Sequence, residues 1–353
     1  MFPFKKKSTP LLGIDITATA IKLLELSKSG GKYRIESYSV EPLPANSVVE
    51  KNIADADVVG EAIGKAVKKS GSRTKGGAAA VYGYAVITKV ITMPADLSDE
   101  DMESQIQLEA DQYIPFPLEE VSLDFEVMGP TEGDEGQVDV LLAASRSENV
   151  DLRIAALEVG GLEAKVVDVE AFALENTVAM MAKESFGGGE GQVIAVADVG
   201  SLVTTFSVLE NLKMIYSREQ AFGGAQLTED IQRRYGLSFE EAGLAKKQGG
   251  LPDNYEPEVL EPFKESMAQQ ISRAQQFFFS SSSIAQIDHM ILAGGCASID
   301  GIADIVEAAV GVPTIVANPF ANMSLSSKVP AQALSNDAPS LIVSCGLALR
   351  SFD

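Results

Sequence analysis

The chain has 353 residues, of which 46% are hydrophobic and 22% charged, as in an ordinary globular protein of about two domains. Its net charge of −22, from 28 basic and 50 acidic residues, disfavours nucleic acid and anionic membrane surfaces as general partners. No apolar run reaches the roughly 18 to 20 residues of a membrane span, and Cys296 and Cys345 lack the spacing of a disulfide framework or a zinc site, so we expect a reducing, cytoplasmic compartment.

The chain starts with a basic segment, MFPFKKKSTP, which is either a tail or a short segment that touches a membrane or a partner. Residues 11–16 then form an apolar strand. Residues 21–43 predict two strands joined at Ser29-Gly30-Gly31, a hairpin signal. Apolar residues three and four apart predict a helix over 55–70 that ends at Gly71.

The rest of the first half alternates strands and helices. Ser98 and Asp101 resemble a capping pair at the start of a helix that Pro115 stops. The other expected elements are β-rich residues 78–94, paired strands at 121–129 and 137–145, a helix over 148–161, and a strand that runs into a helix over 165–185. FGGGEGQ, residues 186–192, is the best linker candidate, and we expect a domain boundary there.

The second half opens with VIAVADVGSLVTTFSVLE, residues 193–210, which repeats the pattern of the opening stretch LLGIDITATAIKLLEL. Each copy is an apolar strand, an aspartate, a small-residue hairpin and a second strand, with Asp198 in the place of Asp15. Later segments predict a long core-facing helix through residues 267–283, and a strand, a Gly294-Gly295 turn and a helix over 289–311. His289, the single histidine, is expected to be structural.

The repeat suggests an anion site. Backbone N–H groups of a tight hairpin can converge on a phosphate, and a carboxylate at a strand end can hold Mg²⁺ directly or through water. Two such hairpins that face each other would clamp a polyphosphate between two domains, with a cation between Asp15 and Asp198. The alternative is that both aspartates are ordinary turn residues at strand ends.

The order of these motifs resembles the actin-like ATPase superfamily over nearly the whole chain. GIDITATAIK and VADVGSLVTTF look like its two phosphate loops, LAGGCASIDGI like its adenosine motif, and VVDVEAFALENTVA and SCGLALRS like its two connecting helices. The resemblance implies an α/β, actin-like fold of duplicated RNase H-like domains. The first would span residues 1–190 with an FtsA-type inserted subdomain at about 85–160. The second would span 191–353, with a nucleotide-contacting subdomain at about 225–285.

The resemblance also implies roles for single residues in binding ATP and Mg²⁺. Asp15 and Asp198 would face the metal and its waters, and Glu170 would orient the attacking water. The phosphates would be approached by Lys22 and by the two hairpins, and the ribose and adenine by two later loops. These residues are Thr17, Ala18, Thr19, Gly200, Ser201, Gly223, Gly224, Lys246, Gly294, Gly295 and Ser298.

Three positions depart from the superfamily pattern. Thr17 stands where relatives commonly have glycine, Gly243 where a ribose-contacting glutamate is usual, and Ala171 where a proline follows the acidic residue. Together they imply that ATP binds but is hydrolysed weakly or not at all.

Within the superfamily, the chain is most similar to FtsA and to the PilM family of type IV pilus assembly, through IPFP at 114–117 and AFGG at 221–224. The PilM resemblance implies a cytoplasmic scaffold for pilus biogenesis and twitching motility. It would bind the N-terminal cytoplasmic peptide of PilN beside the inserted subdomain and reach the inner membrane through partner proteins. Other pilus proteins and a second copy of the chain are further expected partners.

Other functions on the same fold stay open. A sugar or acid kinase would need a positioned carboxylate base and an acceptor pocket, and no recognisable base motif is present. A cell-division role like that of FtsA is the second alternative, although the C-terminal amphipathic helix expected of FtsA is missing. A DnaK-type chaperone would need a further substrate domain.

Overall fold

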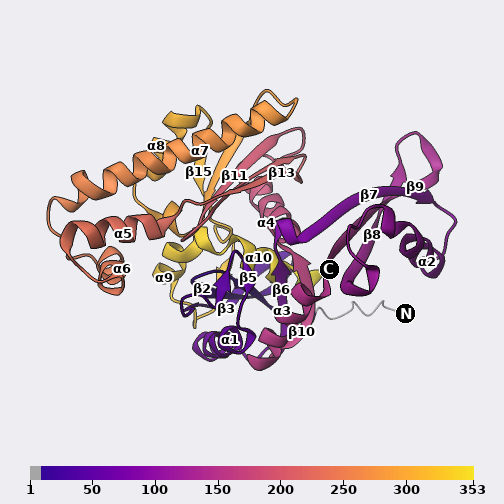
Figure 1. Ribbon diagram of the computed structural model, residues 1–353, viewed down its shortest axis with the longest axis horizontal. Helices are drawn as coiled ribbons and strands as arrows, with labels where there is room; N and C mark the ends of the chain where they lie inside the picture. Colours follow the sequence, from indigo (N-terminus) through magenta and orange to yellow (C-terminus); the bar gives the residue numbers. More distant parts are fainter. Residues whose placement is uncertain (1–8) are drawn as a thin grey trace.

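The computed structural model describes residues 9–353, apart from the side chains of Tyr84 and Asp111. The interpretation of the first eight residues therefore lies outside the described part of the chain. Two large sheets form the body of the protein, and a third, small sheet projects from it (Figure 1).

The first sheet is built mainly from the first half of the chain. Its strand order is β10-β6-β1-β2-β3-β16. The bounds are β10 Glu163–Val169, β6 Gly76–Val81, β1 Leu11–Ile16, β2 Ala20–Ser29, β3 Lys32–Pro42 and β16 Ser324–Leu325. The hairpin expected at residues 29–31 is confirmed as the turn between β2 and β3, where Gly30 and Gly31 have φ values of 57° and 81°.

The second sheet repeats the central arrangement of the first. Its order is β13-β12-β11-β14-β15, with β13 Lys213–Gln220, β12 Thr204–Glu210, β11 Val193–Val199, β14 His289–Ala293 and β15 Thr314–Val316. In both sheets the strand that carries the repeated aspartate is antiparallel to the next strand and parallel to a later one. The sequence repeat therefore corresponds to a structural one.

Helices cover and separate the sheets. The bounds are α1 Ala56–Ser70, α3 Ser147–Val159, α4 Glu170–Ser185, α5 Gly224–Tyr235, α6 Phe239–Gln248, α7 Glu261–Ser281, α8 Ile302–Val310, α9 Ala331–Asp337 and α10 Ile342–Leu349. Helix α1 ends at Gly71, whose φ of 67° is left-handed, as predicted. A buried cluster joins β1, β6, α4, β11, β14 and α10, so α4 and α10 pack between the two sheets.

The C-terminal part of the chain returns to the first sheet. Strand β16 pairs with β3, and α10 packs on β1. Gly13 of β1 permits this approach, because a Cβ there would lie 2.2 Å from the carbonyl oxygen of Ser344. The backbone N–H of Leu11 also donates to Oγ of Ser351 at 2.9 Å. The end of the chain thus helps to hold β1 in place.

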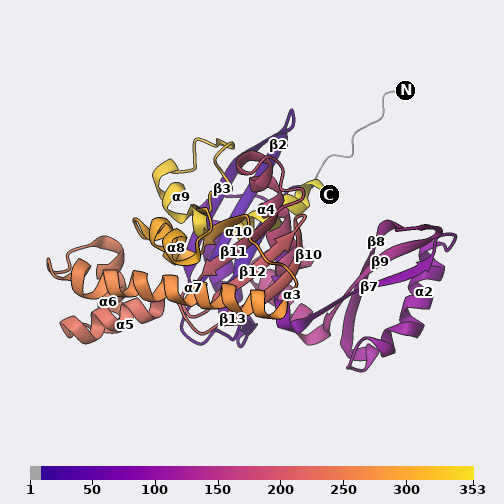
Figure 2. The same cartoon turned by 90° about the horizontal axis from the view of Figure 1, so that it is seen from above.

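The small sheet belongs to the inserted segment. Strands β7 Val86–Pro94, β9 Asp134–Arg146 and β8 Val121–Thr131 lie in the order β7-β9-β8, with α2 Asp99–Glu109 on one face. The turn between β8 and β9 is shorter than expected. Ser98 caps α2 by accepting from the N–H of Asp101 at 3.2 Å, as predicted, but the helix tightens into a 3₁₀ turn at Ala110–Gln112 before Pro115. Both views show this subdomain projecting from the body, on the side away from α5 and α6 (Figures 1 and 2).

Among residues 9–353, no helix combines the length and apolar character that crossing a bilayer requires.

Candidate functional site

The first repeated aspartate is buried and paired. Asp15 is 4% exposed, and its Oδ2 lies 3.0 Å from Nζ of Lys22, which stands opposite it in the β1–β2 register. The Tyr82 hydroxyl donates to the carbonyl of Ile16 and lies 3.5 Å from Oδ1 of Asp15. A lone buried carboxylate is costly, so this ion pair explains how a strand as buried as β1 can carry Asp15.

The second repeated aspartate lies close enough to interact with the same lysine. Burial raises the pKa of Asp198, and the ammonium groups of Lys22 and Lys51 oppose that rise. Burial alone would lower the pKa of Lys22, but the carboxylates of Asp15 and Asp198 outweigh it, so the pKa is raised. The ammonium of Lys22 therefore lies in the field of both aspartates.

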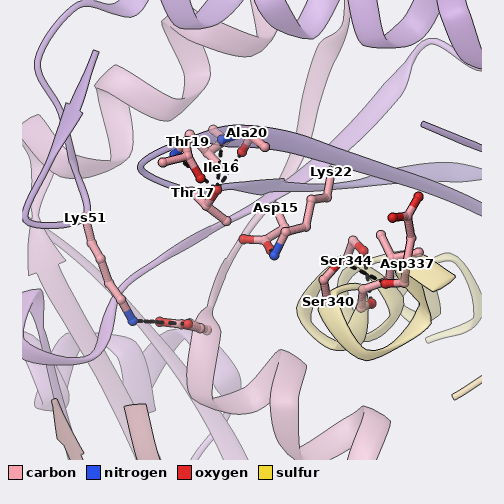
Figure 3. Close-up of polar contacts among 12 residues, drawn as sticks. Asp15, Ile16, Thr17, Thr19, Ala20, Lys22, Lys51, Asp337, Ser340 and Ser344 are labelled. Atoms are coloured by element: carbon pink, nitrogen blue, oxygen red, sulfur yellow. Dashed lines mark hydrogen bonds and ion pairs between the residues drawn. The ribbon is translucent and has the colours of Figure 1, made fainter. Parts of the chain in front are cut away.

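The first hairpin is closed by Thr17, at the position where the superfamily resemblance predicts glycine. The Thr17 hydroxyl donates to the carbonyl of Ala20 at 2.8 Å and accepts from the N–H of Ala20 at 3.1 Å (Figure 3). This is the local side-chain-to-backbone bonding that Ser and Thr use in turns. Ala18 is half-buried at the tip of the hairpin, and Thr19 is exposed there.

The second hairpin is tied to the start of α5. The N–H of Gly224 donates to the carbonyl of Gly200 at 3.0 Å, and the N–H of Ala225 donates to the carbonyl of Ser201 at 2.8 Å. A Cβ at Gly223 would lie 2.4 Å from the carbonyl oxygen of Ser201. Glycine is needed here because the two backbones are in contact, so the second hairpin and the loop before α5 meet at one point.

Two further segments pack beside the second hairpin and the start of α5, and together these four segments form one wall of the candidate site. Lys246 of α6 donates to the carbonyl of Gly224 at 2.9 Å and to the Thr228 hydroxyl at 2.7 Å. Gly294 has a φ of 83°, and a Cβ there would lie 2.3 Å from the carbonyl oxygen of Val199. Gly295 has open space where a Cβ would be, so a flat ring could lie against it.

Ser298 lies at the far end of this wall. It is exposed, and its hydroxyl donates to the carbonyl of Asn336 at 2.9 Å. Asp337 follows Asn336. Burial raises the pKa of its carboxyl, and the positive charge of Lys22 is among the charges that oppose that rise. Figure 3 shows Asp337 on the same side of the site as Lys22. The segment that contacts Ser298 is therefore close enough to β2 for Asp337 to interact with Lys22.

Glu170, the candidate catalytic residue, begins α4 and is held by Lys51. Nζ of Lys51 lies 3.1 Å from Oε2 and 3.3 Å from Oε1 of Glu170. Burial raises the pKa of the Glu170 carboxyl to about 7; Lys51 lowers it, whereas the negative charges of Asp15 and Asp198 raise it. The carboxyl therefore interacts electrostatically with both repeated aspartates.

The structure gathers most of the sequence-predicted residues in two groups. Charge interactions link Asp15, Lys22, Asp198 and Glu170. Backbone contacts link the hairpin Gly200-Ser201 to Gly223 and Gly224, to which the side chain of Lys246 is added, and Gly294 lies against Val199 at the end of β11. Sequence reasoning missed Lys51, Glu219 and Tyr82, and it treated Cys296 only as a core residue. Cys296 is buried as expected, but its Sγ also lies 3.7 Å from the carbonyl of Gly200.

The discounted histidine has a structural contact. The His289 ring stacks on the Phe186 ring with centroids 4.1 Å apart. This contact attaches the glycine-rich segment after α4 to the start of β14.

The donor set fits Mg²⁺ bound together with a polyphosphate. Residues 9–353 contain no group of three or more His, Cys, Asp and Glu side chains that could hold a metal by itself. Mg²⁺ is usually bound by one or two carboxylates plus waters and substrate phosphates. Asp15 and Asp198 could supply those carboxylates, and the ion would neutralise phosphate charge.

Comparison with known proteins identifies the family. A family model described as type IV pilus assembly protein PilM matches residues 13–352, so the chain belongs to this family, as its sequence suggested. The structure is similar to a solved chain titled "PilM-PilN type IV pilus biogenesis complex", with a TM-score of 0.77 and 28% identity over 99% of this chain and 100% of that one.

A more distant match supports the fold alone. The ethanolamine utilization protein EutJ from Carboxydothermus hydrogenoformans is 16% identical, with a TM-score of 0.55 over 99% of this chain and 91% of that one. Together the two similarities confirm the expected α/β, actin-like fold. A fold of this kind is compatible with nucleotide binding but does not by itself assign a function.

Proposed function

We propose that this chain, a member of the PilM family, is an ATP-binding scaffold of type IV pilus assembly that captures the N-terminal cytoplasmic peptide of PilN. In this role it is cytoplasmic, reaches the inner membrane through PilN and serves twitching motility. The family match over residues 13–352 supports the assembly role. The ion pair of Lys22 with Asp15 and the charge interaction of Lys22 with Asp198 support the nucleotide site, because they put both hairpins near one position.

Within this proposal, ATP and Mg²⁺ bind between the two halves. Asp15 and Asp198 hold the ion, and Lys22 with the hairpins 17–19 and 200–201 holds the phosphates. Gly223, Gly224, Lys246, Gly294, Gly295 and Ser298 surround the nucleoside. Hydrolysis is weak, because Lys51 engages both oxygens of Glu170 and leaves that carboxyl poorly placed to orient a water.

A groove beside the inserted subdomain is the proposed peptide site. It has a volume of about 500 Å³ and is lined by β8 and β9, by the end of β10, by the first turn of α4 and by the C-terminus. β8 and β10 are edge strands of their sheets. Edge strands offer backbone hydrogen bonds to an extended peptide, and side-chain pockets supply specificity.

The groove is lined by apolar and negatively charged side chains. Leu141, Val166 and Phe172 supply apolar surface, while Asp124, Glu126 and Asp353 supply negative charge. Its one arginine, Arg350, is already paired with Asp168 through contacts of 2.6 and 2.8 Å. The groove is therefore suited to an extended segment in which a basic residue stands among apolar ones.

Two titrations test the proposal. A fluorescent ATP analogue with Mg²⁺ should bind the wild type and lose at least tenfold in affinity with Asp198→Ala, but not with Asp253→Ala, an exposed carboxylate of the same half. Failure of the wild type to bind would refute the nucleotide role.

A labelled peptide from the N-terminus of PilN tests the groove. Glu126→Lys reverses a groove charge and Ala143→Trp fills the groove, so each should weaken binding at least fivefold. Glu132→Lys makes the same charge change on exposed surface outside the groove lining and should leave binding unchanged. Equal effects of the two charge reversals would place the peptide elsewhere.

A further inference from the structure

Lys51 connects the two halves of the protein across the candidate nucleotide site. Its ammonium contacts Glu170 at 3.1 Å in the first half, and Glu219 of β13 at 2.7 Å in the second. It also donates to the Thr205 hydroxyl of β12 at 3.3 Å. Lys51 and Glu170 are each 17% exposed, so their contact is largely shielded from water and salt, whereas Glu219, at 32%, keeps part of its side chain in solvent.

The backbone that presents Lys51 is in an unfavourable conformation. Strands β4 Val48–Val49 and β5 Asn52–Ile53 are joined by a two-residue turn, Glu50-Lys51, with φ values of 48° and 62°. Turns with two positive φ values favour Asn-Gly or Asp-Gly, and Glu-Lys carries a steric cost. Such strain persists where the surroundings fix it and is concentrated at functional positions.

The surroundings of the turn fix it. Arg153 of α3 is 1% exposed; it donates to the carbonyl of Lys51 at 3.1 Å and to that of Ala80 at 2.7 Å. Both cations also lie near the Tyr82 ring, whose centroid is 4.9 Å from Nζ of Lys51 and 5.4 Å from Cζ of Arg153. Contacts within the first half thus hold the turn in the orientation that directs the Lys51 side chain toward the second half.

We propose that Lys51 is a positioning residue that latches the two halves together and slows the release of a bound nucleotide. The inference rests on the proposed nucleotide site. A nucleotide enclosed between the halves leaves when they separate, and separation must break the contacts of Lys51 with Glu219 and Thr205. Figure 3 shows Lys51 approaching from a different segment than Asp15 and Lys22, so the latch does not use the phosphate hairpins.

The first test measures the rate at which a bound fluorescent ATP analogue is displaced by excess ATP. Lys51→Met should raise the dissociation rate at least fivefold, whereas Lys51→Arg, which keeps the charge, should stay within twofold of the wild type. Lys69→Met removes an exposed lysine whose ion pair with Glu41 lies within the first half and should change nothing.

A second variant attacks the bridge from the other half. Glu219→Gln should also raise the dissociation rate, and adding it to Lys51→Met should give less than a further twofold change, because both substitutions break one interaction. An unchanged rate with Lys51→Met, or independent additive effects of the two changes, would overturn the proposal.

The third measurement needs no nucleotide. Spin labels at Glu61→Cys in α1 and Glu240→Cys in α6, both exposed positions, report the distance between the halves. The two native cysteines are buried, which limits background labelling. Lys51→Met should broaden and lengthen the distance distribution. If the wild type binds no nucleotide, the proposed function is refuted, and the distance measurement still tests whether Lys51 holds the two halves together. An unchanged distance distribution in Lys51→Met would overturn the latch.

Discussion

The contact between α4 and α10 leaves no room for a single methyl group. A Cβ at Gly346 would lie 1.8 Å from the carbonyl oxygen and 2.4 Å from the carbonyl carbon of Ala173, whereas ordinary contacts begin at 3.4 Å. Relief would require α10 to move by more than 1 Å. On its other side α10 touches β1, where a Cβ at Gly13 would lie 2.5 Å from the backbone nitrogen of Ala348. Helix α10 therefore cannot move away from α4 without clashing with β1.

Gly346→Ala is therefore expected to destabilise the protein. Overpacking in a core costs about 1–3 kcal/mol or more, and the gain in helix propensity from glycine to alanine offsets about 1 kcal/mol. Because the clash is with backbone on a packed helix, we expect a cost above that range, about 3–5 kcal/mol, and therefore a net loss of about 2–4 kcal/mol in the free energy of unfolding. Urea unfolding followed by circular dichroism measures it as a lower midpoint.

A matched substitution in another helix gives the opposite sign. Gly64 lies inside α1, and a Cβ there would meet its nearest neighbour, the carbonyl oxygen of Gly160, at 3.6 Å. Gly64→Ala should therefore stabilise by about 0.5–1 kcal/mol, mainly through propensity. The reasoning would be refuted if Gly346→Ala were as stable as the wild type, or if both substitutions destabilised alike.

Two further outcomes are expected. Burial raises the pKa of the Glu170 carboxyl from 4.5 to about 7, so the folded state binds this proton more tightly than the unfolded state. The free energy of unfolding should therefore fall by up to ~3 kcal/mol as the pH rises from 4.5 to about 7. Glu170→Gln should remove this pH dependence from the urea midpoints measured across the same interval. Arg350→Lys breaks one of two contacts to Asp168, which is 4% exposed, and should lower stability by about 2–3 kcal/mol; an unchanged thermal midpoint would contradict this.

Local patterns in the sequence predicted the repeated core of the fold. The strand, aspartate and hairpin motif, placed at residues 11–26 and 193–210, corresponds to β1–β2 and β11–β12 with Asp15 and Asp198 at equivalent positions. Helix α1 was predicted with its cap because apolar spacing and Gly71 are both short-range signals. The capping box of α6, Ser238 with Glu241, carried a similar signal that the sequence reasoning did not use.

Long-range contacts were not predictable in the same way. Lys51 meets Glu170 across 119 residues and Thr205 across 154, and its turn lacks the Asn-Gly signature that would have marked a hairpin. The pairing of Arg350 with Asp168 spans 182 residues. The Arg350 pair depends on how the C-terminal segment returns to the first sheet, and the contact of Lys51 with Thr205 depends on how the two halves pack, neither of which a local propensity encodes. The residues missed at the candidate site are those held by tertiary contacts.

The proposed groove and the proposed nucleotide site share one short segment, residues 168–172. Only variants outside this segment can test the two sites independently. Asp168, Val169 and Phe172 line the groove, whereas Glu170 contacts Lys51 on the nucleotide side. A substitution at 168–172 therefore perturbs both sites, and a loss of either ligand there would not identify the cause. Glu126 lies in the inserted subdomain and Asp198 in the second sheet, so changes at these two positions report on one site each.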